Sequence, residues 1–166
     1  AAGADLDGEI GEHHEPETHL IPLAIATALG MRESLDVYGS DYPTPDGSAL
    51  RDYVHVADLA TAHVQALNYL RAGGDSTALN LGTGVGHSVR EVISAVESIA
   101  EKRILTSDKP RRPGDPPALV ADATLARQIL GWIPCHSELD VIVQTAYRWQ
   151  AQLNDSRRAG SIIGLS

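Results

Sequence analysis

The chain has 166 residues, of which 43% are hydrophobic and 21% charged, a composition that predicts one globular domain with its own core. Its formal net charge of -9 argues against a nucleic acid or a membrane surface as the partner. The single cysteine, Cys135, excludes an internal disulfide and is typical of a reducing cytoplasm, and no histidine pair has the H-x-x-x-H spacing of a zinc site, so we expect no metal.

The first part of the chain predicts a loop, a helix and a strand. Residues 1–17 are polar and resemble an interior loop, so we expect the chain to be a piece of a longer one. Residues 19–29 are apolar almost throughout, with Pro22 in the first turn and Gly30 after the end, and they predict a buried helix. Residues 34–38 predict a short strand.

The most informative stretch is 41–56, DYPTPDGSALRDYVHV. Its first half is a loop rich in proline and glycine, and its second half alternates apolar and polar residues, which predicts a strand over 50–56. Arg51 lies at the junction, where a guanidinium suits a bidentate grip on phosphate or carboxylate. The alternative is an ordinary surface ion pair with a nearby acidic residue.

The rest of the chain alternates helix and strand patterns. Apolar residues fall on one helical face from about Asp58 to Leu70, and Ser88 and Glu91 have the spacing of a capping box. The expected elements are helices over 58–70, 89–100, 122–130 and 137–150 and strands over 77–81, 103–106 and 118–121.

This alternation makes the fold class α/β. The strands are few and short, which indicates part of a larger sheet. Asp122 and Ser137 are expected to cap the last two helices. Because the helical pattern ends near Gln150, we expect an ordered domain over 1–152 and a disordered tail over 153–166.

Two glycine-containing loops could bind phosphates. GTGVG at 82–86 follows a strand pattern and precedes a helix, but the full G-x-G-x-x-G spacing fails, so a plain tight turn before a capped helix is the alternative to a dinucleotide loop. RRPGD carries Arg112 and Asp115 in a proline-stiffened loop, where the alternative is a solvated charged turn. Together, Arg51 and Arg112 could clamp a pyrophosphate, and Asp115 could accept hydrogen bonds from sugar hydroxyls.

The usual catalytic motifs are absent from this sequence. A Tyr-x-x-x-Lys pair would need a lysine four residues after a tyrosine, and neither Lys102 nor Lys109 meets this spacing. There is no G-x-S-x-G elbow and no pair of carboxylates arranged for acid–base catalysis. We therefore expect no catalytic residue in this chain.

The chain resembles the UDP-sugar 4-epimerases of the extended short-chain dehydrogenase/reductase family in five motifs: DYPTPDGSALRDYVHV at 41–56, NLGTG at 80–84, RRPGD at 111–115, GWIP at 131–134 and YRWQ at 147–150. The resemblance covers about residues 1–152. The YPTPDG insertion before RDY is its most specific part, because it is typical of hexose and pentose 4-epimerases.

The resemblance implies the carboxyl-terminal, substrate-binding portion of such an enzyme, lacking most of the Rossmann sheet. The other half would carry the nucleotide-binding glycine loop, the Tyr-x-x-x-Lys pair and most of the NAD site. The intact protein would interconvert UDP-glucose and UDP-galactose with NAD, as a cytoplasmic homodimer. The isolated chain would bind the UDP-sugar without turning it over.

The resemblance also implies roles for individual residues. Arg51 and Arg112 would bind the diphosphate and Asp115 the ribose, while Asp36 and Tyr38 would line the uracil slot.

Four further positions follow from the same alignment of motifs. Leu20 and Tyr53 would lie near the nucleotide, and His19 stands where the family often has asparagine. Leu119 occupies a position that limits sugar size. Because Leu119 is a medium-sized residue, N-acetylated sugars stay open. The alternative substrates are UDP-arabinose/xylose and UDP-N-acetylhexosamines, and the alternative to an enzyme is a nucleotide-sugar-binding module without catalysis.

Overall fold

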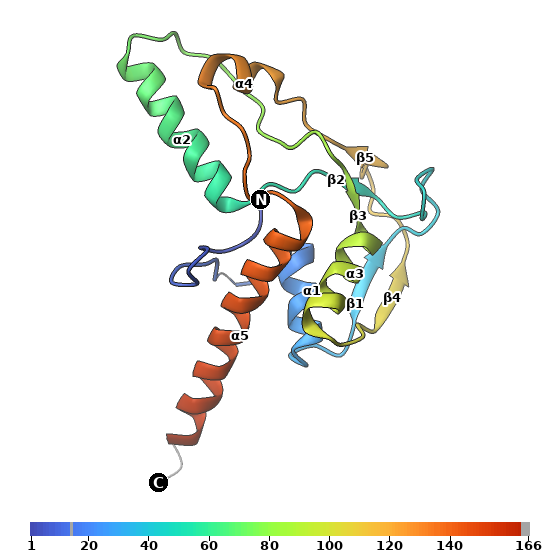
Figure 1. The fold of residues 1–166 in the computed structure, drawn as a ribbon. Coiled ribbons are helices and arrows are strands. Elements are labelled where there is room, and N and C mark those ends of the chain that lie inside the picture. Colours follow the sequence, from blue (N-terminus) through green and yellow to red (C-terminus); the bar gives the residue numbers. More distant parts are fainter. Residues whose placement is uncertain (14, 164–166) are drawn as a thin grey trace.

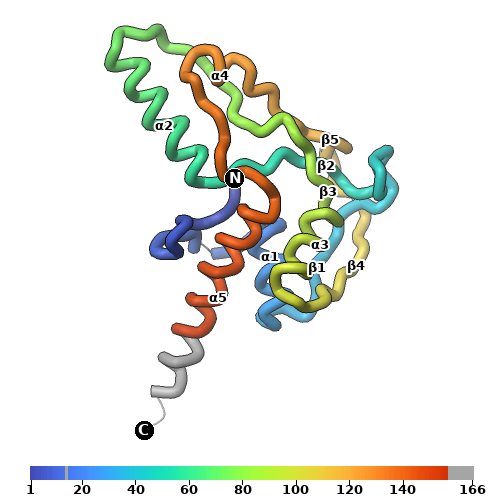
Figure 2. Tube along the Cα trace, in the orientation of Figure 1, coloured from blue at the N-terminus to red at the C-terminus, as the bar shows by residue number. Residues whose placement is uncertain are grey.

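The computed structural model describes residues 1–13 and 15–163, with side chains up to residue 156 (Figures 1 and 2). The elements in chain order are α1 (Leu20–Ala28), β1 (Leu35–Tyr38), β2 (Leu50–Arg51), α2 (Val56–Arg71), β3 (His87–Ser88), α3 (Val89–Ala100), β4 (Thr106–Lys109), β5 (Ala118–Leu119), α4 (Thr124–Leu130) and α5 (Leu139–Ile163). No helix among them has the length and apolarity needed to cross a bilayer.

The larger core lies between α1, α3, α5 and strand β1. Ile25 of α1, Val37 of β1, Val96 of α3 and Val143 of α5 are all fully buried in it. Helix α1 is apolar around its circumference because it is enclosed by the other elements, and Gly30 ends it with a positive φ of 73°. These features confirm the predicted buried helix.

The sheet structure is divided into two small sheets. β1 pairs in parallel with β4, in register from Leu35 opposite Thr106 to Tyr38 opposite Lys109. The predicted strand over 103–106 is therefore wrong by three residues. The amide of Ile104 donates to the Glu97 carboxylate (2.8 Å), so this segment is held to the end of α3 before the strand can begin.

The second sheet has the order β3-β2-β5, with β2 antiparallel to β3 and parallel to β5. The expected strand over 50–56 is shortened to Leu50–Arg51. Beyond it, the Asp52 carboxylate binds amides of other segments, and the His55 ring accepts a hydrogen bond from the amide of Ala57, capping α2. Polar side chains thus end the strand early.

The expected strand over 77–81 is not formed. No strand within 1–13 or 15–163 pairs with it, and the alternating pattern instead places Leu79 and Leu81 against a smaller core of Val54, Ala62, Ala123, Ala126 and Trp132. An alternating sequence becomes a strand only where a neighbouring strand is available.

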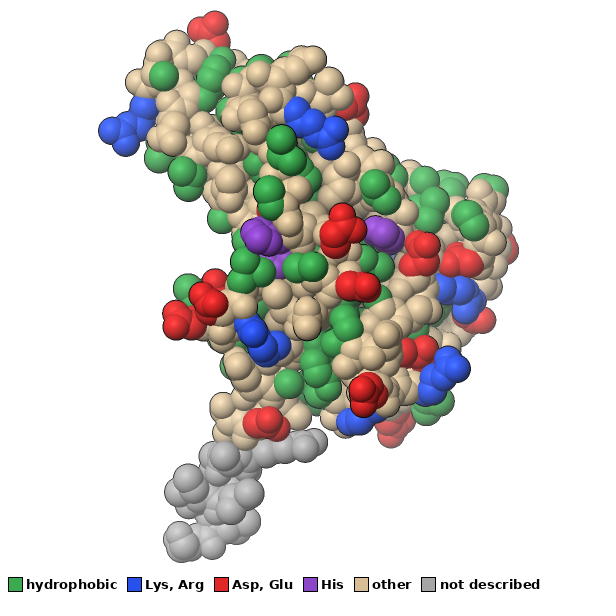
Figure 3. Space-filling view, viewed as in Figure 1, with side chains coloured by type: hydrophobic (Ala, Val, Ile, Leu, Met, Phe, Trp, Pro, Cys, Tyr) green, Lys and Arg blue, Asp and Glu red, His purple; other side chains and the backbone are tan. Residues whose placement is uncertain are grey.

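Helix α2 is buried on a narrower face than the sequence predicted. Asp58 and Ala62 are buried, but Leu67 and Leu70 are 55% and 50% exposed because α2 projects away from the larger core (Figure 1). The space-filling view shows hydrophobic side chains at the surface in this part of the molecule (Figure 3). The predicted apolar stripe is therefore only partly covered.

The last two helices begin differently from the prediction. Asp122 accepts a hydrogen bond from the amide of Thr124 (2.9 Å) in the turn before α4 rather than capping the helix. Ser137 donates to Asp58 (2.5 Å) and accepts from the amide of His55 (2.9 Å), so it joins α2 to the start of α5. Helix α5 extends to Ile163, and residues 164–166 of the expected tail lie outside the described residues.

Candidate functional site

A cavity of about 390 Å³ opens between the start of α1, the two small sheets and the loop after β4. It is lined by seven of the residues singled out from the sequence, which are Leu20, Asp36, Tyr38, Arg51, Tyr53, Arg112 and Asp115. These residues come from four separate segments of the chain. The fold therefore brings the two basic loops to one place.

Arg51 lies in the central strand of the three-stranded sheet. Its backbone lies opposite His87 of β3 and Leu119 of β5, and its side chain is 23% exposed. One guanidinium nitrogen donates to the carbonyl of Leu50 (2.6 Å), and another forms an ion pair with Asp115. The charged end of Arg51 is thus held at the wall of the cavity.

Arg112 is held against an aromatic ring. Its guanidinium carbon lies 4.1 Å from the centroid of Tyr38, the last residue of β1, in a cation–π contact. The neighbouring Arg111 is directed elsewhere, because its Nε donates to Asp41 (2.7 Å) and its guanidinium lies 4.3 Å from the Tyr42 ring. The hydrogen bond from Arg111 lowers the pKa of Asp41.

Two further predicted residues add polar groups to the cavity. The Asp36 carboxylate lies 3.6 Å from the ammonium of Lys109, which belongs to the paired strand β4. Burial raises the pKa of Tyr53 to about 12, with Arg51 acting in the opposite direction. Tyr53 is therefore a neutral phenol at physiological pH and can donate a hydrogen bond.

His19 and Leu119 are not among the residues that line the cavity. The His19 side chain is 57% exposed and its Nδ1 lies 2.9 Å from the Glu17 carboxylate. With Glu12 these groups place three potential ligand atoms within 4.8 Å, an arrangement that exposed acidic residues often have without an ion. Leu119 is 54% exposed and lies beside Arg51 across the sheet.

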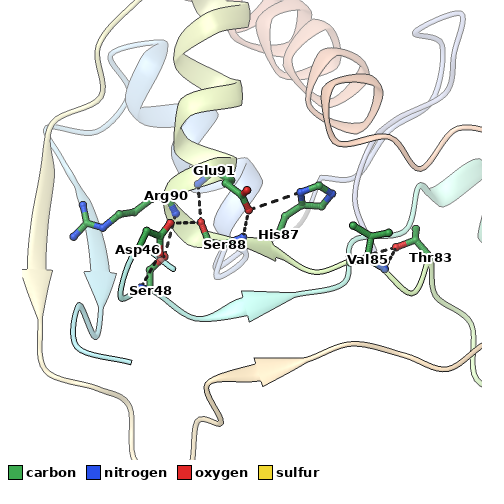
Figure 4. A network of polar contacts seen from close by, with 8 residues as sticks. All are labelled: Asp46, Ser48, Thr83, Val85, His87, Ser88, Arg90 and Glu91. Atoms are coloured by element: carbon green, nitrogen blue, oxygen red, sulfur yellow. Dashed lines mark hydrogen bonds and ion pairs between the residues drawn. The ribbon is translucent and has the colours of Figure 1, made fainter. Parts of the chain in front are cut away.

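The loop of residues 41–48, which precedes β2, is anchored to the start of α3 by a polar network (Figure 4). The Asp46 carboxylate accepts from the amide and hydroxyl of Ser48 (2.9 and 2.7 Å) and from the hydroxyl of Ser88. Ser88 and Glu91 form the predicted capping box. Burial raises the pKa of Asp46, but the bonds from Ser88 and Ser48 outweigh it and leave this pKa below its usual value.

The glycine-rich turn has its amides occupied within the chain. The amides of Thr83 and Gly84 both donate to the Asp52 carboxylate (3.0 Å each). These are the groups that a dinucleotide loop would offer to phosphates. The geometry is that of the alternative interpretation, a tight turn before a capped helix.

Several cavity residues were not singled out from the sequence. Arg32 enters from the segment after α1, and the other lining residues of this kind are Glu17, Thr18, Leu23, Leu35, Ala49 and Val89. No local pattern around Arg32 distinguishes it from a surface arginine. Only the packing of α1 against β1 brings it to the cavity.

The arrangement defines a class: an α/β unit in which arginine side chains, carboxylates and an aromatic ring from separate segments line one cavity. Residues 9–145 match the family model described as GDP-mannose 4,6 dehydratase, and the chain belongs to that family.

Individual relatives are similar over almost the whole chain. UDP-glucose 4-epimerase of Rhizobium meliloti (strain 1021) is 53% identical over 154 residues, which are 93% of this chain and 47% of the relative. The crystal structure of UDP-glucose 4-epimerase from Brucella ovis in complex with NAD has 50% identity and a TM-score of 0.85, over 88% of this chain and 45% of that one.

The UDP-glucose-4-epimerase from Stenotrophomonas maltophila, with bound NAD and formylated UDP-arabinopyranose, has 42% identity and a TM-score of 0.88, over 93% of this chain and 46% of that one. The chain thus spans about half the length of these relatives. The resemblance to 4-epimerases and the prediction of a partial α/β fold with few strands are confirmed.

Proposed function

We propose that this chain forms the UDP-sugar-binding part of an NAD-dependent UDP-glucose 4-epimerase, which interconverts UDP-glucose and UDP-galactose. The observation that carries the proposal is the convergence of Arg51 and Arg112 on one cavity beside the Tyr38 ring. The three relatives described above are named UDP-glucose 4-epimerases, and their names support the same substrate class.

The chemistry of the cavity matches the parts of a nucleoside diphosphate. Two guanidinium groups neutralise the diphosphate, and each charge-assisted hydrogen bond contributes about 1.5–3 kcal/mol. The aromatic face of Tyr38 offers a stacking surface for the base, a contact of about 1–3 kcal/mol. Asp115 and the neutral Tyr53 offer an acceptor and a donor for hydroxyl groups.

NAD does not fit the residues of this chain. The glycine-rich turn uses its amides on Asp52, and no Tyr-x-x-x-Lys pair is present in the sequence. When bound, NAD would accept and return a hydride at the sugar ring, and we assign its site to residues of the intact protein outside this chain. The residues described above bind and orient the UDP-sugar for that step.

The intact enzyme is proposed to be a cytoplasmic homodimer, with no nucleic acid or membrane partner. On the face shown in Figure 3, acidic and basic side chains are interspersed rather than gathered into a basic patch, in agreement with the net charge of -9.

The test uses the protein in its full natural length. Purified enzyme with NAD is expected to convert UDP-galactose to UDP-glucose. The UDP-glucose formed is measured by a second enzyme that oxidises it in a coupled assay. UDP-arabinose, UDP-xylose and UDP-N-acetylglucosamine in parallel reactions define the substrate range. Turnover of none of these sugars, with UDP binding retained, would instead establish a binding module without catalysis. A gene segment upstream encoding Tyr-x-x-x-Lys is the simplest supporting observation.

A further inference from the structure

The carboxylate of Asp52 joins three segments at one end of the β3-β2-β5 sheet. One of its oxygens accepts from the amide and hydroxyl of Thr83 (3.0 and 2.6 Å), and the other accepts from the amides of Gly84 and Ala121 (3.0 and 3.2 Å). Thr83 and Gly84 precede β3, whereas Ala121 follows β5. Both neighbours of the central strand are thereby tied to the residue after Arg51.

The sheet itself gives Arg51 little support. β2, β3 and β5 have two residues each, so the ladder contains few hydrogen bonds at this position. Beyond the ladder, the amide of Asp52 donates to the carbonyl of Leu119 (3.1 Å). The four bonds to the carboxylate therefore form a large share of what fixes the backbone direction where Arg51 leaves the sheet.

The packing around this carboxylate is close. A Cβ atom at Gly82 would lie 2.6 Å from Oδ2 of Asp52 and 2.4 Å from the Cβ of Ala121. The turn can therefore approach Asp52 only because residue 82 is glycine. Asp52 is not among the residues that line the cavity, so it acts on a ligand through its neighbours.

We propose that Asp52 is a positioning residue for Arg51, and that it holds the guanidinium at the distance from Arg112 that a diphosphate requires. This inference rests on the proposed function, because it assigns the diphosphate to Arg51. The carboxylate binds the turn before β3 and the segment after β5, and so keeps the strand that carries Arg51 from rotating. Loss of its charge weakens the grip on phosphates and leaves the base contact in place.

The test is a double-mutant cycle on UDP binding to the protein in its full natural length, measured by titration calorimetry. Asp52→Asn is expected to weaken UDP binding about tenfold, within the range of coupling energies for residues in contact. In the Arg51→Ala background the same change is expected to have almost no effect. Uridine, which lacks phosphates, is expected to bind Asp52→Asn and the unchanged chain equally.

A matched control is Asp122→Asn, which removes the same charge from a carboxylate that accepts from Thr124 in a neighbouring turn. It is expected to leave UDP affinity unchanged. If Asp52→Asn does not fold, as judged by circular dichroism, Thr83→Val takes its place in the cycle with an effect of about threefold. It removes one of the four bonds to Asp52, together with the local bonds of the Thr83 hydroxyl to Val85.

The outcomes separate the two proposals. Unchanged UDP affinity in Asp52→Asn, or an equal loss with and without Arg51, overturns the positioning role and leaves the proposed function intact. An equal loss of uridine binding overturns it as well, because the effect is then a general loss of structure. If the unchanged full-length protein binds neither UDP nor inorganic pyrophosphate, the proposed function is wrong, and with it the role of Asp52.

Discussion

Arg51 and Asp115 form an ion pair at the wall of the cavity, although 64 positions separate them in the sequence. Their side chains are 23% and 30% exposed, so the pair is only partly open to solvent. The two residues proposed to bind the diphosphate and the ribose are thus bonded to each other. A bound nucleotide must therefore share the Arg51 guanidinium with Asp115, or displace the Asp115 carboxylate from it.

This pair leads to a prediction for Asp115→Asn. Loss of the carboxylate charge frees Arg51, so inorganic pyrophosphate is expected to bind about two- to fivefold more tightly, the effect of removing a partly exposed ion pair. UDP, which would also lose its ribose acceptor, is expected to gain less or to bind more weakly. Titration calorimetry with both ligands measures the difference, and weaker pyrophosphate binding would contradict the competition.

Removal of either arginine of the clamp is expected to impair the full-length enzyme. Arg51→Ala and Arg112→Ala each remove charge-assisted hydrogen bonds to the diphosphate and should raise KM for UDP-galactose about tenfold or more. Arg111→Ala is the matched control, because Arg111 is bonded to Asp41 and Tyr42 instead of lining the cavity. Steady-state kinetics of the three variants check this prediction. If Arg51→Ala and Arg112→Ala have the same KM as Arg111→Ala, the two arginines do not bind the diphosphate.

The 166-residue chain without the rest of the protein is expected to be inactive as an epimerase. It contains neither the Tyr-x-x-x-Lys pair nor a free dinucleotide loop. With UDP-galactose and added NAD, product analysis by chromatography should show no UDP-glucose. Formation of product would mean that a base in this chain had been overlooked.

Stability is expected to fall with acidification through His55. Its Nδ1 accepts from the amide of Ala57 and its Nε2 is hydrogen-bonded to Thr145 (3.0 Å each), in a fully buried position. Burial lowers the pKa of His55; Asp58 raises it and the facing His136 lowers it. The unfolded chain therefore takes up the proton first, and stability is lost as the pH falls below about 6.5, the usual histidine value.

The variant that checks this is His55→Asn, which keeps an oxygen to cap α2 and cannot be protonated. Its melting temperature should be lower at neutral pH because packing is lost. Between about pH 7.5 and 5.5, however, it should decline less than that of the unchanged chain. Parallel curves would show that His55 does not titrate in this window.

Trp132 is expected to dominate the stability of the smaller core. It is fully buried and its Nε1 donates to the carbonyl of Asp58 (2.9 Å). Trp132→Ala should cost about 3–5 kcal/mol of unfolding free energy, measured by urea denaturation. Ile133→Ala next to it, where the side chain is 67% exposed, should cost at most about 0.5 kcal/mol.

Much of the fold could be predicted because its strongest patterns are local. The capping box of Ser88 and Glu91, the apolar helix ended by Gly30 and the irregular RRPGD loop depend on neighbours in the sequence, and all three are present. The strand over 50–56 failed because long-range partners compete for its polar side chains. The Asp52 carboxylate accepts a hydrogen bond from Thr83, 31 positions away, and no sequence pattern predicts that contact.

The same distinction holds for the site. Arg51 and Arg112 were notable because each lies in a stiff loop, and the structure places both at one cavity, while their roles stay predictions. Arg32, Asp52 and the contact between Arg51 and Asp115 depend on tertiary packing alone. Ser137 was assigned a local capping role, but it bonds Asp58, 79 positions away, because that carboxylate is within reach only in the folded chain.

The two cores differ in how firmly they hold their helices. The smaller one contains Val54, Ala62, Ala123, Ala126 and Trp132, and α2 leaves Leu67 and Leu70 largely uncovered. By contrast, α1 is enclosed and α3 buries its apolar face in the larger core. Local opening with low free energy is therefore concentrated in α2 and α4. In hydrogen–deuterium exchange, the amides of α2 and α4 should exchange while those of α1 and α3 stay protected. The smaller core can then open locally while the walls of the cavity keep their structure.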